Sequence, residues 1–467
     1  MQIPWNAFWF IIGVSLLVTI HEFGHFWVAR KLGFKVLRFS VGFGKPLYKK
    51  IGAAPDHIEY VIAAIPLGGY VRMLDERDGK VDPSDVPRAF GSRPPWQRIL
   101  VLLAGPAANI LFAVLVLWGL FWVSGITHVK ASVDNVVVGS IADKAGLKQG
   151  DELRSINGEP ILDQFDARLL LLDVVSDDGR ASIVVRDRRG ADRTVTLEVS
   201  DPEVRFALTG KDRLNEGLGF DFWQPRLPAV LGGVTEGGPA DKAGLRAGDE
   251  IRSLDGIPVR NFNEMADYIN ARPDKEVVVG VRRGAENFTR RLTTVSDKVD
   301  GRIIGRLMIQ QPVVENPYPP DMRTHTEVGG VAAFTYSVSK AWQMTVAQAK
   351  FFVRMIKRQF STDSVAGFLS IAGYAGDAAR VGFTAFLMLL VLLSLSLGFL
   401  NLLPIPLLDG GQIVFQLIEW VKGGPLSERT YLVGQQAGLV LLALLMGLAL
   451  FNDLNSIDWA RIFGARS

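Results

Sequence analysis

Four long stretches of this sequence contain no charged residue, and they constrain the fold more than any other feature. The stretches run to 20, 29, 28 and 23 residues and span 1–20, 99–127, 381–408 and 430–452. About 20 helical residues are needed to cross a hydrocarbon core that is about 30 Å thick. The sequence therefore excludes a freely soluble protein and predicts four transmembrane helices, over residues 1–30, 99–125, 381–410 and 430–452.

The rest of the sequence has the character of soluble, folded chain. Mean hydropathy is only +0.21 although 48% of the residues are hydrophobic, so the average combines apolar helices with polar domains. Residues 128–380 contain an internal repeat, in which 142–160 recurs 98 positions later as 240–258 with thirteen of nineteen positions identical. A duplicated unit of about 90 to 100 residues fits a small independent domain.

The charges predict an orientation. Between residues 30 and 55 there is no Asp or Glu but there are seven cations: Arg30, Lys31, Lys35, Arg38, Lys45, Lys49 and Lys50. The positive-inside rule therefore places the loop 31–98 in the cytoplasm, and 411–429 returns to that side as an amphipathic helix or loop. The N-terminus, the repeats and the tail 453–467 then face the other side of the membrane, which in a bacterium is the periplasm. The first helix lacks the positive n-region of a signal peptide and is expected to be retained.

The composition also narrows the partners. Net charge is +3, and the Lys and Arg residues are not gathered into a stripe, so no nucleic acid partner is indicated. The chain has no Cys. Any metal must therefore take His or carboxylate ligands.

The motif that indicates a chemical function most directly is His21-Glu22-Phe23-Gly24-His25. Residues i and i+4 share one face of a helix, so both imidazoles can bind one Zn²⁺ while Glu22 lies beside a water molecule. The apolar pattern continues to Ala29, which places these ionisable groups inside a membrane helix, where such groups are costly and functional by default. The alternative is a polar helix end with snorkelling side chains, and His and Glu snorkel poorly compared with Lys and Arg.

Two His leave a zinc site incomplete. The other three His, His57, His128 and His325, fall outside the charge-free stretches. Asp409 directly follows the third stretch, in the sequence Asn-Leu-Leu-Pro-Ile-Pro-Leu-Leu-Asp-Gly-Gly of residues 401–411. Because the first and third helices run in the same direction, Asp409 is the expected third ligand, near the cytoplasmic side. The alternative role for Asp409 is the N-cap of a helix over 412–420.

A helical substrate must be unwound before its peptide bonds can be attacked. Pro404 and Pro406 interrupt the third helix and free backbone carbonyls, which suits a substrate-facing loop. The stretch 57–73 predicts a hairpin around a Pro-Leu-Gly-Gly turn. We hypothesise that its edge, together with Asn401, hydrogen-bonds the substrate backbone; a merely structural hairpin is the alternative. The edge residues are Gly69, Tyr70, Val71, Arg72 and Met73.

Residues 313–380 predict an amphipathic helical linker, because apolar residues recur at helical spacing between 328 and 360 and basic residues occupy the remaining positions. Its basic face either lies on membrane lipid or packs on the helices.

His21 to His25 and the 401–411 string resemble the site-2 protease family. Further strings carry the likeness, namely 41–45, 65–71, Ala104-Gly-Pro106 with Asn109, and 446–453. The resemblance implies a zinc intramembrane endopeptidase, with His21, His25 and Asp409 as ligands, Glu22 as general base and a membrane-associated β-loop. It also implies single-pass substrates in a bacterial inner membrane that a site-1 protease has already trimmed, namely anti-sigma factors of envelope-stress signalling and remnant signal peptides.

The repeats resemble PDZ domains, with Asn157-Gly158 and Asp255-Gly256 as hairpin turns. Gly217, Leu218, Gly219 and Phe220 look like the PDZ peptide-binding loop, and their place at the end of the unit matches the circularly permuted bacterial form. We expect two such domains, over 126–222 and 223–312. They either bind peptides or screen substrates by size, and size exclusion is slightly favoured because bulky domains over a membrane site would block large ectodomains.

The expected fold is thus a polytopic α-helical membrane protein with four transmembrane helices, a cytoplasmic-side β-hairpin and two tandem permuted PDZ domains. Two functions of different class remain, a zinc protease and a membrane-anchored PDZ adaptor whose metal site is structural or vestigial. The intact His-Glu pattern, the distant Asp and an open fourth position favour the protease.

Overall fold

The computed structural model of the protein describes residues 2–210, 213–299, 302–312, 314, 317–362 and 365–456. The chain forms two compact units. The first holds Met1–Ile126 and His325–Leu450, and the second holds Thr127–Thr324 with the chain from Phe451 onward. Most of the expected tail 453–467 lies outside the described residues.

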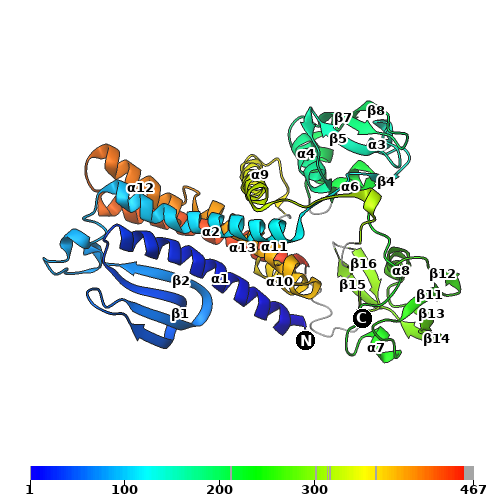
Figure 1. The fold of residues 1–467 in the computed structure, drawn as a ribbon, viewed down its shortest axis with the longest axis horizontal. Helices are drawn as coiled ribbons and strands as arrows, with labels where there is room; N and C mark the ends of the chain where they lie inside the picture. The colour runs from blue at the N-terminus through cyan, green and yellow to red at the C-terminus, as the bar shows by residue number, and fades with distance from the viewer. Residues whose placement is uncertain are drawn as a thin grey trace. The chain divides into compact units, whose positions relative to one another are not determined.

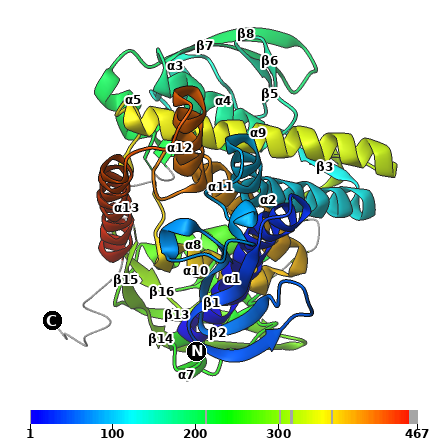
Figure 2. The same ribbon diagram turned by 90° about the vertical axis from the view of Figure 1, so that its left-hand side faces the viewer.

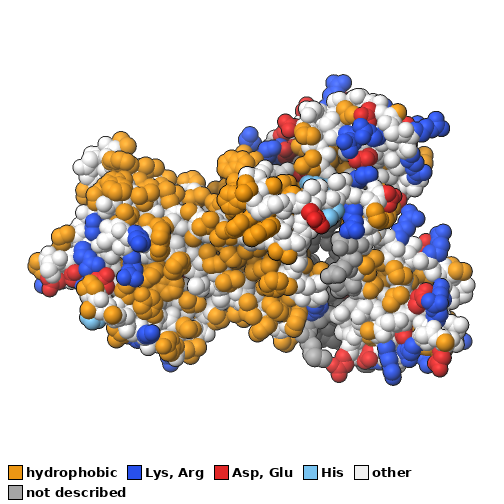
Figure 3. Space-filling model, viewed as in Figure 1, with side chains coloured by type: hydrophobic (Ala, Val, Ile, Leu, Met, Phe, Trp, Pro, Cys, Tyr) orange, Lys and Arg blue, Asp and Glu red, His pale blue; other side chains and the backbone are white. Residues whose placement is uncertain are grey.

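The first unit is built on four helices that are long and apolar enough to cross a membrane. They are α1 (Gln2–Lys31), α2 (Pro95–Ser124), α11 (Phe383–Asn401) and α13 (Glu428–Ser456). Hydrophobic side chains cover the visible face of this unit (Figure 3). The third helix is shorter than expected and ends at Asn401, because Pro404 and Pro406 lack the N–H that a continuing helix needs.

Helix α2 is the centre of the first unit. It contacts α1, α11, α9 (Gly330–Ile356) and α12 (Asp409–Lys422), and both ribbon views show it between α1 and α9 (Figures 1 and 2). Helix α10 (Phe368–Val381) packs on α1 and α11. The predicted amphipathic stretch 328–360 forms one long helix, α9. The separate helix α10 lies between α9 and α11 in the chain.

A sheet of two long strands, β1 (Val36–Ile51) and β2 (Glu59–Met73), covers α1. Residues 38–41 pair with 69–72 on one side and with 59–62 on the other, and 46–51 pairs with 59–63. The prediction of a hairpin within 57–73 is therefore wrong, because the partner strand is the cation-rich segment 36–51. Gly68 lies inside β2 at a φ of 136°, where a Cβ would come within 2.2 Å of the Phe43 ring. The chain reverses direction between residues 62 and 69, but 59–62 and 69–72 lie on opposite sides of 38–41 and do not pair with each other. Gly68 allows close packing on Phe43 in this connection.

A buried apolar cluster ties this sheet to the helices. It contains Phe26 and Ala29 of α1, Val36 of β1 and Val101 of α2, and Val71 and Met73 of β2 pack against it. Two short 3-10 helices, η1 (Glu76–Asp78) and η2 (Val86–Arg88), lead from the sheet to α2. The loop 31–98 is therefore anchored on the membrane helices through its strands.

The second unit contains the two repeats, which share one topology. Each has a four-stranded sheet and a separate strand pair, in the orders β6-β5-β7-β8 with β4-β9, and β12-β11-β13-β14 with β10-β17. Each repeat has its own buried core. They differ where the first inserts helices α5 and α6 and the second inserts the hairpin β15-β16.

The first repeat comprises β4 (Val133–Val136), α3 (Ile141–Lys144), β5 (Glu152–Ile156), β6 (Glu159–Pro160), α4 (Gln164–Ser176), β7 (Arg180–Arg186), β8 (Asp192–Glu198), α5 (Pro202–Leu208), α6 (Arg213–Leu218) and β9 (Phe220–Phe222). The second comprises β10 (Gly233–Val234), α7 (Pro239–Lys242), β11 (Glu250–Leu254), β12 (Ile257–Pro258), α8 (Phe262–Asn270), β13 (Glu276–Arg283), β14 (Glu286–Thr293), β15 (Val295–Val299), β16 (Arg302–Arg306) and β17 (Ile309–Gln310). Outside them lie β3 (Ile126–Val129), η3 (Pro320–Met322) and β18 (Arg323–Thr326).

The predicted hairpin turns of the repeats are confirmed. Ile156 pairs with Glu159 and Leu254 with Ile257, which leaves two residues in each turn. Both residues of each turn have φ between 49° and 84°. That left-handed backbone is what a two-residue turn of this type requires and what Asn-Gly and Asp-Gly tolerate.

Candidate metal centre

Two histidines lie one turn apart on α1 and share a buried face. Nε2 of His21 and Nε2 of His25 are 3.1 Å apart, and both side chains are buried. The i, i+4 spacing of the sequence thus places both ring nitrogens at one point in space.

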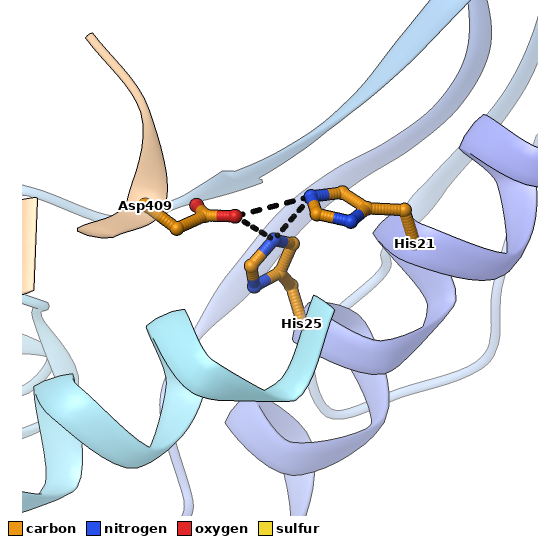
Figure 4. A group of neighbouring side chains, drawn as sticks. All are labelled: His21, His25 and Asp409. Atoms are coloured by element: carbon orange, nitrogen blue, oxygen red, sulfur yellow. Dashed lines mark hydrogen bonds and ion pairs between the residues drawn. The ribbon is translucent and has the colours of Figure 1, made fainter. Parts of the chain in front are cut away.

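Asp409 meets them from the first turn of α12. Its Oδ2 atom lies 3.1 Å from Nε2 of His21 and 3.5 Å from Nε2 of His25, and Figure 4 shows the three side chains pointing toward one another. The N-cap position of α12 is Leu408, so Asp409 is not the N-cap residue. The carboxylate is turned to the imidazoles instead.

The three groups fit a zinc ion. Within the described residues they form the one group of three or more His and carboxylate side chains whose ligand atoms all lie within 4.8 Å of one another. Ligand atoms about 2.0–2.1 Å from a tetrahedral ion are about 3.3 Å apart, which agrees with the separations here. Two neutral imidazoles and one carboxylate are also a donor set that catalytic zinc sites use.

Room for the imidazoles comes from glycine. A Cβ on Gly105 of α2 would lie 2.2 Å from Nε2 of His25, and a Cβ on Gly24 of α1 would lie 2.2 Å from the carbonyl oxygen of Ala104. Both glycines let α1 approach α2 closely enough for the rings to fit between them. The small residues of the second membrane helix, Gly105 among them, predict close helix packing, and the approach of α1 to α2 agrees with that prediction. The sequence did not indicate that the imidazoles occupy the space at Gly105.

Glu22 follows His21 on α1 and is half-buried. A Cβ on Gly69 would lie 3.3 Å from Cγ of Glu22, and the backbone of Val71 lies next to the Glu22 carboxylate. The carboxylate therefore lies between the metal centre and the edge of β2.

The strand edge presents its backbone, and not every side chain, to this region. Val71 and Met73 pack in the core against α1. The Tyr70 hydroxyl accepts a hydrogen bond of 3.0 Å from Arg38, and its ring stacks on Phe43. Arg72 is exposed. Of the five residues expected to bind substrate at this edge, Gly69 and Val71 lie next to Glu22.

The loop that follows α11 is folded tightly beside the metal centre. Nδ2 of Asn401 lies 3.5 Å from Nε2 of His21. The carbonyl of Pro406 accepts a 2.6 Å hydrogen bond from Gln412, which in turn accepts one from Tyr431 of α13. A Cβ on Gly411 would lie 2.1 Å from the carbonyl oxygen of Ile405. Gly411 thus lets the loop that contains Pro404 and Pro406 fold back on α12.

The loop Gly217 to Phe220 belongs to the second unit. Leu218 and Phe220 are fully buried in the core of the first repeat. Gly219, at a φ of 81°, donates its N–H to the carbonyls of Asn215 and Glu216. That amide is consequently already used within the repeat.

Comparison with known proteins agrees with this geometry. Residues 9–445 match the family model described as peptidase family M50. A protein of Neisseria meningitidis named as a zinc metalloprotease is 37% identical over 96% of this chain and 98% of its own. The regulator of sigma-E protease RseP of Escherichia coli K12 is 36% identical over 97% and 99%.

Among solved structures, the PDZ domain of an SdrC-like protein from Listeria monocytogenes aligns with 19% of this chain and 90% of its own, at 21% identity and a TM-score of 0.16. That likeness is too low to support an assignment.

Fold, site and relatives together define an intramembrane zinc metalloprotease, and the adaptor alternative is set aside. The chain belongs to peptidase family M50, which is the site-2 protease family.

Proposed function

We propose that His21, His25 and Asp409 hold the catalytic zinc ion and that Glu22 is the general base. The main support is the convergence of the three ligand atoms to within 3.5 Å of one another inside the membrane unit. Bound zinc supplies Lewis-acid activation of water and of the scissile carbonyl. Glu22 takes a proton from the attacking water and returns it to the leaving nitrogen as the peptide C–N bond breaks.

The substrate segment is held in extended form at the edge of β2. Val71 lies on the edge segment 69–72 of the sheet, and its backbone is next to the Glu22 carboxylate, so this edge is beside the metal centre. An added strand there would replace the helical hydrogen bonds that the substrate loses. Asn401, 3.5 Å from His21, would bind substrate backbone on the other side of the metal, and the loop of Pro404 and Pro406 would line the same path.

The protein is placed in a bacterial inner membrane, with the metal centre near the cytoplasmic side. Support comes from the cations of 30–55, which mark the loop after α1 as cytoplasmic. The N-terminus, the two repeats and the C-terminus then face the periplasm.

The substrates are single-pass membrane proteins. RseP of Escherichia coli is named for regulating sigma-E, which supports an anti-sigma factor of the envelope-stress response as one substrate; remnant signal peptides are the other. The repeats act as permuted PDZ domains that exclude substrates with large ectodomains. A separate site-1 protease would then have to shorten each substrate first.

The proposed function is tested by replacing Glu22 with Gln. Cleavage of a model transmembrane substrate by the purified protein in detergent should fall about 10²–10⁴-fold, because the proton acceptor is lost. Zinc content should stay at the wild-type value, whereas His21→Ala should lose zinc. Glu428→Gln, an exposed carboxylate in the first turn of α13, is the matched control. A Glu22→Gln variant that cleaves at the wild-type rate would refute the assignment.

A further inference from the structure

Both zinc-binding histidines turn their second ring nitrogen toward α2. Nδ1 of His25 lies 2.8 Å from the carbonyl oxygen of Val101. Nδ1 of His21 lies 3.2 Å from the side-chain amide of Asn109. The outer nitrogen of a metal-ligating His commonly hydrogen-bonds a carbonyl or carboxylate, which fixes the ring for the metal. Helix α2 thus offers one outer partner to each ring, one from the backbone and one from a side chain.

Asn109 is held rigidly where it meets His21. Its side chain has no exposed surface. Its backbone carbonyl accepts a 2.9 Å hydrogen bond from Ser394 of α11, and a Cβ on Gly398 of α11 would lie 3.5 Å from its Cβ. The α11 helix therefore packs on the backbone and Cβ of Asn109 and keeps its side chain beside His21.

The amide also carries an atom without a partner. Oδ1 of Asn109 is fully buried and forms no hydrogen bond within the described part of the chain. Burying an unpaired amide oxygen inside a membrane unit costs about 1–3 kcal/mol. A residue that served only for packing would meet no such cost if it were apolar, so the polar group has to be explained by what it faces.

We propose that Asn109 is a positioning residue that orients His21 for the zinc ion. When Nε2 of His21 directs its lone pair to the metal, Nδ1 carries the proton and needs an acceptor. Rotating the Asn109 amide by a half-turn puts Oδ1 where Nδ2 lies, 3.2 Å from Nδ1 of His21. The otherwise unpaired oxygen then accepts a hydrogen bond from the Nδ1–H group. This inference rests on the proposed role of His21 as a ligand.

The test measures zinc affinity and not proteolysis. Full-length protein in detergent would be titrated against a competing chelator. Asn109→Leu keeps the volume and removes the hydrogen bond, and zinc binding should weaken about 10–100-fold. Asn109→Asp keeps an acceptor oxygen and should restore the affinity to within a few-fold of wild type. Ser337→Ala, which removes a buried hydroxyl from α9 that bonds only within its own helix, should bind zinc like wild type.

The absorption bands of the Co²⁺-loaded protein provide a second measurement, since they respond to ligand geometry and not to general packing. They should shift in Asn109→Leu and be restored in Asn109→Asp. Unchanged affinity and bands in a monodisperse Asn109→Leu protein would overturn the proposal, as would equal losses in the Leu and Asp variants. If His21→Ala itself kept its zinc, the ligand assignment would fail instead, and the two failures are therefore distinguishable.

Discussion

The two imidazoles fit against α2 only because residue 105 has no side chain. A Cβ there would lie 2.2 Å from His25 and 2.8 Å from His21. Gly105→Ala should therefore displace the rings at a cost of about 1–3 kcal/mol, or roughly 5- to 150-fold in zinc affinity. Chelator competition measures this loss. Gly119→Ala is the matched control, because no atom lies within 4 Å of that Cβ on the same helix; equal affinities in the two variants would show that the space at Gly105 is not needed.

At the residue scale, the sequence predicts the proposed zinc ligands more easily than it predicts the residues around them. His21 and His25 follow from helical spacing, and Asp409 follows because the chain has no Cys and few other ligands near the apolar helices. The carbonyl of Val101 could not be foreseen, since every residue has a carbonyl and only packing selects which one faces His25.

The edge of β2 is tested by removing a single N–H. Val71→Pro deletes the backbone N–H beside the Glu22 carboxylate, on an edge strand of the sheet, where Pro is tolerated best. The rate of substrate cleavage should fall by at least about tenfold, because a hydrogen bond to a charged group contributes about that factor. Val71→Ala keeps the N–H while losing a similar apolar contact and should stay within about threefold of wild type. Similar initial rates for the Pro and Ala variants would rule out strand addition here.

The two repeats hold a matching buried aspartate with arginines from different strands. Asp151 is paired with Arg193 of β8, whereas Asp249 is held at 2.7 and 2.8 Å by Arg283 of β13. Both aspartates also accept a hydrogen bond from a loop N–H three residues earlier, at Lys148 and Arg246. The two repeats thus share the buried aspartate and the loop N–H that bonds it. They differ in the strand that supplies the arginine.

The Asp249 pair predicts a pH dependence of stability. Burial by itself raises the pKa of Asp249, but the Arg283 guanidinium and the Arg246 N–H outweigh it and hold the pKa below its ordinary value. The unfolded chain therefore binds this proton at a higher pH than the folded repeat does. The stabilisation is complete above about pH 4, the unfolded value, and is lost as pH falls through the folded pKa.

Urea unfolding of the full-length protein, followed by pulsed hydrogen exchange in β11 and β13, measures this dependence. The unfolding midpoint should fall between pH 7 and pH 3, and Asp249→Asn should remove most of that difference. If the midpoints of the wild-type protein and of the Asp249→Asn variant fall in parallel, the effect belongs to other groups.

At the scale of the whole molecule, the proposed size filter can be removed in one piece. The chain leaves the first unit after Ile126 and returns at His325, and a Cβ on Gly125 would lie 2.7 Å from the His325 ring. A short linker can therefore replace 127–324 without stretching the membrane unit. The deletion should retain zinc and cleave substrates with large ectodomains that the full chain leaves intact. Loss of all cleavage with zinc retained would instead favour a substrate-receptor role for the repeats.

The sequence by itself determined the parts of this protein that follow from local spacing. Absence of charge over about 20 residues specifies a membrane helix, the i, i+4 histidines specify one half of the proposed metal site, and the repeated motif specifies two similar domains with their turns. Each of these properties is set by neighbours along the chain, whose geometry in a helix or turn is fixed.

Only the tertiary structure decided how distant segments meet. It paired β2 with the cation-rich 36–51 segment and placed Asn109 and Gly105 against the histidines. These outcomes depend on the space between packed helices and strands, where a missing Cβ or a single buried amide selects the contact. The spacing of residues along the chain does not determine the space between packed elements.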